Sequence, residues 1–330
     1  MTYKSIVVTR RGSPEVLKVV ENDRREPVAG EVRIKVQACS VTQEDVCNRR
    51  GDRPFLVKIP FVPGYAIVGI VDGLGAGVSE FSVGDRVAAL TKTGGYTECI
   101  YLDAEQLVPV PPGLDPAEAV VLILNYLVAY QSLHRYARVK AGDKVLIVGA
   151  SGGVGSAFLE LGRLAGLTMY GLAAASKHHL LAEMGAVPID YRTQDFVEVL
   201  GRMEPDGIDC VFNGMGDEYF ERGLAVLRRG GRLVHYGAPT SFGRFLLVLA
   251  KFLFYAALPN GKTILGYGTH RVELPLLKAD WAALFKLLEE GQIKPIVAAR
   301  YPLLEAVEAN ELLESGSVIG TIVLVSPELC

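Results

Sequence analysis

The 330-residue sequence has little of what builds disulfide frameworks or structural metal sites. It contains five cysteines, an odd number, and no two of them have Cys-x-x-Cys spacing. We therefore expect reduced thiols, with neither a disulfide framework nor a structural zinc site. The net charge is −3 and no basic stripe is visible, which argues against a nucleic-acid partner. Reduced thiols and an N-terminus without the apolar core of a signal peptide favour a cytoplasmic protein.

Long hydrophobic runs are also missing. The longest, residues 245–258, is interrupted by Lys251 and is shorter than the ~20 residues that a membrane-spanning helix needs. Such a run fits a buried helix, a contact between subunits or a lid. Attachment to a membrane surface is the minor alternative.

Two styles of sequence follow one another along the chain. Up to about residue 115, short β-like runs alternate with Gly and Pro, which predicts a small irregular β-barrel. From Asp115, which can cap a helix, strands and helices alternate as in a doubly wound parallel sheet. From about Lys262 the pattern returns to strands and one helix, which could fold back onto the first domain. We predict an α/β protein with a barrel domain (1–117 and 262–330) and a Rossmann domain (118–261).

A glycine-rich turn follows the buried strand predicted at residues 144–148. The diphosphate of a dinucleotide needs unpaired backbone N–H groups at a helix N-terminus. A side chain at Gly152 would hold the phosphates away, and Gly155 lets the helix pack close to the strand. The turn alone could be a tight connector, but the flanking strands and helix favour a dinucleotide site. Its residues are Gly149, Ala150, Ser151, Gly152, Gly153, Val154 and Gly155.

The residues after the second strand of this domain indicate which dinucleotide binds. In NAD sites an acidic residue near the end of this strand binds the ribose hydroxyls. Here the strand ends at Ala173 and no carboxylate follows. Ser176 and Lys177 instead offer a hydroxyl and a cation, which suit a 2′-phosphate; for Ser176 the alternative is to cap a helix. We therefore expect NADPH as the cofactor.

These residues resemble the medium-chain dehydrogenase/reductase superfamily, in its zinc-free quinone oxidoreductase (zeta-crystallin-like) branch. The resemblance covers nearly the whole chain and implies a GroES-like catalytic domain beside a Rossmann domain, with the active cleft between them. It is carried by residues 83–87, 94–98, 107–111, 129–130, 149–155, 189–192 and 227–234.

The resemblance also implies contacts to the cofactor. Lys177 and Tyr191 match residues that contact the 2′-phosphate, although Tyr191 taken alone would more often be a packed surface tyrosine. Residues 236–238 match a segment that lies along the cofactor, as expected where a parallel strand ends. The full set expected to bind the cofactor is Asp45, Gly149, Ser151, Gly152, Gly153, Val154, Gly155, Ala173, Ser176, Lys177, Tyr191, Asn213, Tyr236, Gly237 and Ala238.

The places of the family's zinc ligands hold other residues. Zinc-dependent members use a Cys, a His and a third ligand where this chain has Thr42, Tyr65 and approximately Leu124. A catalytic zinc needs about three ligands from His, Cys or carboxylate, so we expect no metal and disfavour zinc-dependent alcohol oxidation.

Without a metal, hydride transfer suits acceptors that are already electrophilic, such as quinones and α,β-unsaturated carbonyl compounds. Thr42 could bind the substrate carbonyl or simply end a strand, and Tyr65 could face the cleft or pack in the barrel. Asn125 could line the nicotinamide pocket. Asp45 could bind the ribose or cap a helix.

The prediction is an NADPH-dependent quinone or enone reductase, with a small-molecule substrate. The alternatives are a non-catalytic NADPH-binding, redox-sensing protein and a protein attached to a membrane or partner through residues 245–258. By analogy, we expect a homodimer with a contact through the edge of the Rossmann sheet.

Overall fold

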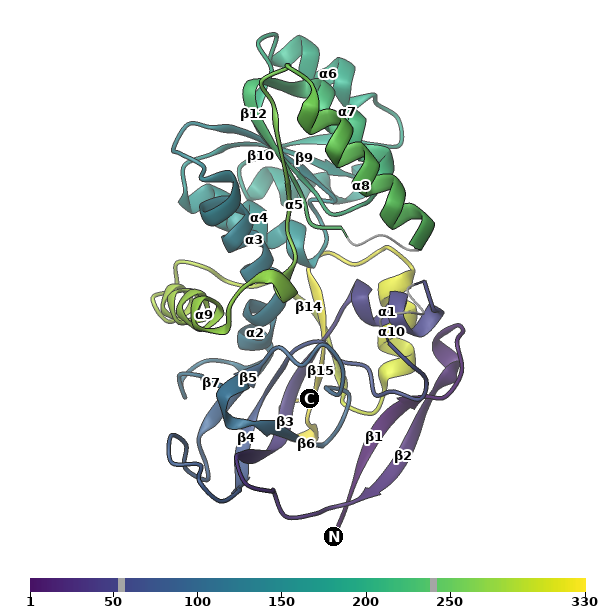
Figure 1. The fold of residues 1–330 in the computed structure, drawn as a ribbon, viewed down its shortest axis with the longest axis vertical. Helices are drawn as coiled ribbons and strands as arrows, with labels where there is room; N and C mark the ends of the chain where they lie inside the picture. The colour runs from purple at the N-terminus through teal and green to yellow at the C-terminus, as the bar shows by residue number, and fades with distance from the viewer. Residues whose placement is uncertain (53–56, 238–241) are drawn as a thin grey trace. The chain divides into compact units, whose positions relative to one another are not determined.

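The computed structural model describes residues 1–52, 57–237 and 242–330. The chain forms two compact units (Figure 1). The barrel unit comprises Met1–Leu124 and Leu274–Cys330, and the Rossmann unit comprises Asn125–Glu273. The predicted two-part α/β architecture is confirmed.

The barrel unit is built on β-sheets. Strands β1 (Thr2–Val8) and β2 (Leu17–Asp23) form an antiparallel pair. A seven-stranded sheet has the order β14-β15-β3-β4-β5-β7, with β6 paired to β3. Alternate residues of β3, such as Val32, Ile34 and Val36, are buried in its core. The strands are β3 (Glu31–Val41), β4 (Ile67–Leu74), β5 (Arg86–Ala89), β6 (Cys99–Asp103), β7 (Val108–Pro109), β14 (Val297–Pro302) and β15 (Thr321–Val325).

In the described residues of the barrel unit the α-helices are α1 (Gln43–Arg50), α2 (Pro116–Val121), α9 (Leu274–Glu289) and α10 (Ala306–Glu314). The Asp115 carboxylate accepts hydrogen bonds from the amides of Ala117 and Glu118, so the predicted cap of this helix is confirmed. In α9, the buried Trp281 ring donates its Nε1–H to the carbonyl of Ile123 at 3.0 Å.

The Rossmann unit contains a six-stranded parallel sheet of order β10-β9-β8-β11-β12-β13. Figure 1 shows α3 and α4 on one side of this sheet and α6, α7 and α8 on the other. The strands are β8 (Lys144–Val148), β9 (Thr168–Ala173), β10 (Ala186–Asp190), β11 (Ile208–Asn213), β12 (Leu227–His235) and β13 (Thr263–Gly266). The helices are α3 (Leu127–Gln131), α4 (Gly153–Leu164), α5 (His178–Glu183), α6 (Phe196–Met203), α7 (Phe220–Val226) and α8 (Phe242–Ala257).

Both boundaries between the two units lie several residues later in the chain than the predicted domain bounds. β13 is hydrogen-bonded to β12, so residues 262–273 lie with the Rossmann unit and not with the barrel tail. The helical stretch Pro116–Ala137 also runs past the predicted bound and contains the π-helical segments η3 (Leu122–Tyr126) and η4 (Ser132–Ala137). By length and composition alone this stretch could cross a membrane, yet 89% of its apolar window is buried inside the protein, as in an ordinary core helix.

Candidate functional site

The predicted cofactor residues of the Rossmann unit follow the ends of its strands. Gly149 follows β8, Lys177 follows β9, Tyr191 follows β10 and Tyr236 follows β12. Because the strands are parallel, these residues share the carboxyl edge of the sheet. The strand order reverses between β8 and β11, and sheets of this type bind ligands at that point.

The glycine-rich turn has the geometry of a phosphate-binding turn. Gly149 has a φ of +74°, a conformation that favours glycine. A Cβ built on Gly152 would meet nothing closer than the Gly149 carbonyl oxygen, at 3.6 Å, so the space over this residue is open. A Cβ on Gly155 would lie 2.6 Å from the Ala150 carbonyl carbon, so only glycine fits where α4 crosses the turn.

The first turn of α4 offers the backbone donors. Gly152 is its N-cap and no side chain caps it, so the amides of Gly153, Val154 and Gly155 have no acceptor within the helix. The Ser156 hydroxyl donates to the Gly153 carbonyl at 3.0 Å, while Ser151 is buried. An anion at this turn would therefore be held by main-chain N–H groups and the helix dipole.

The loop after β11 borders the same turn. The buried Asn213 side chain donates to the Gly216 carbonyl at 2.9 Å and accepts from the Met215 amide at 3.0 Å, so it shapes the loop. Met215 is 60% exposed, and its Cγ and Sδ would lie 3.1 Å from a Cβ on Gly149. Sequence analysis did not identify Met215, because a single methionine in a loop belongs to no motif.

Tyr236 turns its ring into the Rossmann unit. The ring lies 5.5 Å from that of Phe158, and its Cζ would be 2.6 Å from a Cβ on Gly214. Burial raises the pKa of Tyr236. Gly214 directly follows β11, so the ring of Tyr236 packs against a loop at the carboxyl edge. The predicted residue Ala238 lies outside the described residues.

Two cations lie close together at the ends of β9 and β10. The pKa of Lys177 is lowered by burial and by the positive charge of Arg192. The two strands are neighbours, with Asp190 paired to Ala173 in the ladder. Tyr191 is exposed, and the Arg192 guanidinium lies 5.7 Å from the centre of its ring. Sequence analysis did not assign Arg192, although it stands in the matched stretch 189–192.

The carboxylate at the end of β10, that of Asp190, already accepts hydrogen bonds. Asp190 accepts from the Arg192 amide at 3.0 Å and from the Thr193 hydroxyl at 2.9 Å. The hydrogen bond from the Arg192 amide is the main cause of the lowered pKa of Asp190.

Helix α5 begins after Lys177 without a side-chain cap, so the capping alternative for Ser176 is wrong, and Ser176 stays exposed beside Lys177.

In the barrel unit, Thr42 and Asp45 form a capping box at the start of α1. Asp45 Oδ2 accepts from the Thr42 amide at 2.9 Å and from the Thr42 hydroxyl at 2.7 Å. Its Oδ1 accepts from the Gly64 amide at 2.8 Å. Asp45 is 2% exposed, and the capping alternative is the one that the structure shows. The only hydroxyl proton of Thr42 is therefore committed to Asp45.

The same carboxylate fixes the backbone that carries Tyr65. Gly64 has a φ of +106°, and a Cβ there would lie 2.6 Å from the Tyr96 amide nitrogen. Burial raises the pKa of Asp45 to about 6, although its hydrogen bonds with Thr42 and Gly64 act against this. Tyr65 is half-buried. Asn125, the third predicted catalytic residue, is buried at the start of the Rossmann unit.

Metal ligands do not gather in the described parts of the chain. Within residues 1–52, 57–237 and 242–330, no group of three or more His, Cys, Asp or Glu side chains could hold a metal ion. Thr42, Tyr65 and Leu124 offer two hydroxyls and an apolar side chain, a set that does not fit zinc.

Comparison with known proteins agrees with this architecture. The alcohol dehydrogenase GroES-like domain matches residues 28–112 and the zinc-binding dehydrogenase model matches residues 184–324. The synaptic vesicle membrane protein VAT-1 homolog of Rattus norvegicus is 31% identical over 91% of this chain and 78% of its own length.

Two solved structures cover 98% of this chain and 99% of their own. Escherichia coli quinone oxidoreductase complexed with NADPH has a TM-score of 0.87 at 27% identity. The CurK enoyl reductase has a TM-score of 0.86 at 26% identity. The chain belongs to the medium-chain dehydrogenase/reductase superfamily of oxidoreductases, and its two units are the GroES-like and Rossmann-like domains of that fold.

Proposed function

We propose that this protein reduces a quinone or an α,β-unsaturated carbonyl compound, with NADPH as hydride donor and without zinc. The observation that carries the proposal is the pair Lys177 and Arg192 at the carboxyl edge of the sheet that also holds the glycine-rich turn. NADPH differs from NADH by one phosphate group. A pair of cations at this edge therefore favours the binding of NADPH over that of NADH.

The charges favour the phosphorylated dinucleotide. A phosphate monoester carries about −1.5 to −2 charges at neutral pH, so it interacts favourably with both cations and offsets their mutual repulsion. Asp190, the neighbouring carboxylate, is engaged by the Arg192 amide and the Thr193 hydroxyl. It also lies at the end of β10, whereas the acid of an NAD site follows the second strand, which here is β9 and ends at Ala173.

The chain's own residues bind and orient the reactants. NADPH, when bound, supplies the hydride, and the protein supplies position and electrostatic support. Thr42 donates its proton to Asp45, so it can donate to a substrate carbonyl only by giving up that bond. We therefore assign the donor role to Tyr65 or Asn125, with Thr42 and Asp45 holding the backbone beside Tyr65.

The reaction class rests on the relatives. One solved structure is named a quinone oxidoreductase complexed with NADPH, and another an enoyl reductase. Both act, by their names, on acceptors of the electrophilic kind that needs no metal to accept hydride.

Turnover tests the proposal directly. The full chain is incubated with NADPH and a panel of quinones and enones, and loss of absorbance at the nicotinamide band is followed. We expect oxidation with at least one acceptor, and a reduced rate in Tyr65→Phe or Asn125→Ala. Tight NADPH binding without any turnover would instead select the non-catalytic, redox-sensing alternative.

We further propose that the protein is a homodimer through β13 and α8. β13 is the edge of its sheet, and α8 beside it exposes Leu249, Leu253 (66%) and Phe254 (61%). Leu253→Asp should shift sedimentation velocity from dimer to monomer. Co-sedimentation with liposomes that is lost in the same variant, with a monomeric wild type, would support the membrane alternative instead.

A further inference from the structure

A second polar pocket lies in the Rossmann unit, away from the carboxyl edge of the sheet. Its volume is about 300 Å³, and it is lined by Arg135, Tyr136, Arg138, Arg232, Thr263 and Leu265. Arg232 of β12 pairs in register with Cys210 of β11, and Cys210 pairs with Val145 near the start of β8. The glycine-rich turn follows the other end of β8, so the pocket does not belong to the cofactor site.

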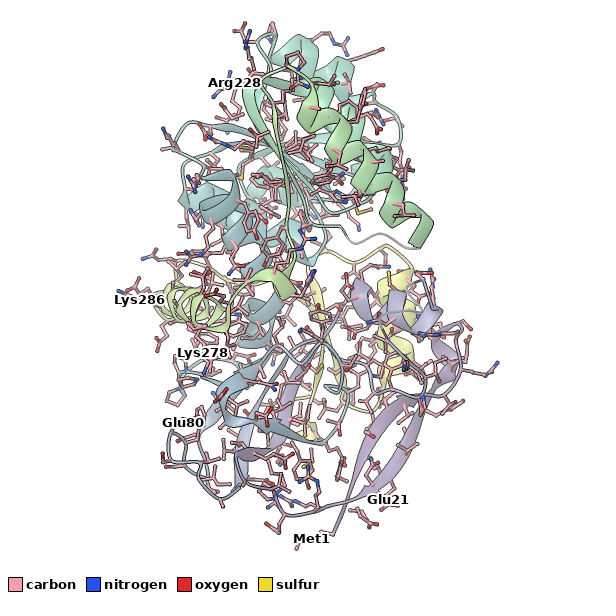
Figure 2. The ribbon with its side chains drawn as sticks, viewed as in Figure 1. Met1, Glu21, Glu80, Arg228, Lys278 and Lys286 are labelled. Carbon is pink, nitrogen blue, oxygen red and sulfur yellow. The ribbon has the colours of Figure 1, made fainter. Side chains whose placement is uncertain are left out.

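The lining is cationic and lacks acidic residues. It contains three arginines and no Asp or Glu among the described residues. Neither Arg138 nor Arg232 has a carboxylate within 4.0 Å in the described parts of the chain. By contrast, Arg228 on the same strand, labelled in Figure 2, donates to Asp209 at 2.6 Å. Unlike Arg228, Arg232 therefore forms no ion pair with any of the described residues.

Arg232 is held in place for a ligand. Its side chain is half-buried, and its Nη1 donates to the Ala137 carbonyl at 2.8 Å. The same side chain also lies within hydrogen-bonding reach of the Cys210 thiol. A guanidinium has five N–H donors, so donors remain for an anion. A preorganised guanidinium loses little entropy when it binds a phosphate in two-pronged fashion.

Arg138 occupies a backbone position that normally selects glycine. It ends η4 with φ 51° and ψ 52°, the left-handed conformation of a helix C-cap. A side chain there is strained relative to glycine. A cation at a helix C-terminus also offsets the helix dipole. An experiment must therefore separate this structural role of Arg138 from a role in ligand binding.

We propose that this pocket binds a small phosphate monoester. The guanidinium groups of Arg138 and Arg232 suit the charge of a phosphoryl group, and the Thr263 hydroxyl is a further donor. Tyr136 and Leu265 provide an apolar wall for the organic part. A volume of about 300 Å³ lies at the small end of ligand sites and exceeds what a bare anion needs.

Phenyl phosphate and inorganic phosphate are the probes, titrated calorimetrically at constant ionic strength. All measurements use the full chain carrying Lys177→Ala and Arg192→Gln, which removes both cations of the proposed cofactor site. The outcome is therefore independent of whether the protein binds NADPH. We expect saturable binding of phenyl phosphate, tighter than that of inorganic phosphate.

Arg138→Gly is the decisive variant because glycine suits the left-handed backbone. It should fold at least as stably as its parent, while phenyl phosphate binding weakens about tenfold or more, as does binding by Arg232→Gln. Arg202→Gln, at an exposed arginine of α6 outside the pocket, is the matched control and should bind normally. The proposal is overturned if phenyl phosphate does not saturate, or if Arg138→Gly binds it unchanged.

Discussion

Replacing Gly152 by alanine separates binding from folding. The backbone at Gly152 has φ −78° and ψ 177°, which alanine adopts without strain. The added Cβ would meet only the Gly149 carbonyl oxygen, at an ordinary 3.6 Å. The exchange of glycine for alanine at an N-cap costs about 0.5–1 kcal/mol of stability. The methyl group nevertheless enters the space where the diphosphate must approach the amides.

The expected loss of affinity follows from the hydrogen bonds displaced. One charge-assisted hydrogen bond contributes about 1.5–3 kcal/mol, so the dissociation constant for NADPH should rise about 10- to 150-fold. Fluorescence titration gives that constant, and urea unfolding gives the stability. Gly155→Ala is the comparison, because its Cβ would lie 2.6 Å from the Ala150 carbonyl carbon and should destabilise the fold itself. Unchanged NADPH affinity in Gly152→Ala would refute the phosphate-binding role of the turn.

Three further predictions concern charge, pH and packing. Lys177→Ala should weaken NADPH binding about tenfold or more while leaving NADH binding nearly unchanged; equal losses for both dinucleotides would remove Lys177 from the 2′-phosphate site. Because Asp45 has a pKa of about 6 in the fold against an ordinary 3.8, the folded state holds its proton more tightly than the unfolded chain. Its contribution to the free energy of unfolding should therefore fall by up to about 3 kcal/mol as pH rises through 4 to 6, and Asp45→Asn should abolish that slope in unfolding titrations. Trp281→Ala should cost about 3–5 kcal/mol, because the ring is buried and its Nε1 is bonded to Ile123; a loss below 1 kcal/mol in urea unfolding would contradict this.

The Rossmann unit was readily predicted because its signals are local. Strand β9 ends at Ala173, as the sequence predicts, and the helix after Asp115 has the predicted cap. The phosphate turn combines backbone requirements that only glycine satisfies, so Gly149 and Gly155 could be interpreted without coordinates. The sheet edge at β13 was harder, because a four-residue strand resembles the strands of the barrel and only its partner reveals where it belongs.

Some site residues could likewise be predicted from local sequence, whereas others depend on tertiary contacts. Lys177 could be identified because its position follows from a strand end. The pairing of Lys177 with Arg192 depends on neighbouring strands, and that of Asp45 with Gly64 on a loop that approaches from elsewhere in the chain. Such contacts are set by tertiary packing, which is why the sequence left two roles open for Thr42 and Asp45.

The central claim is that this chain holds NADPH through the glycine-rich turn and the neighbouring cations. Its most direct test is calorimetric titration of the purified full chain with NADPH and, separately, with NADH. We predict saturable one-to-one binding of NADPH per chain and clearly weaker binding of NADH. Absence of saturable binding for both dinucleotides would contradict the account.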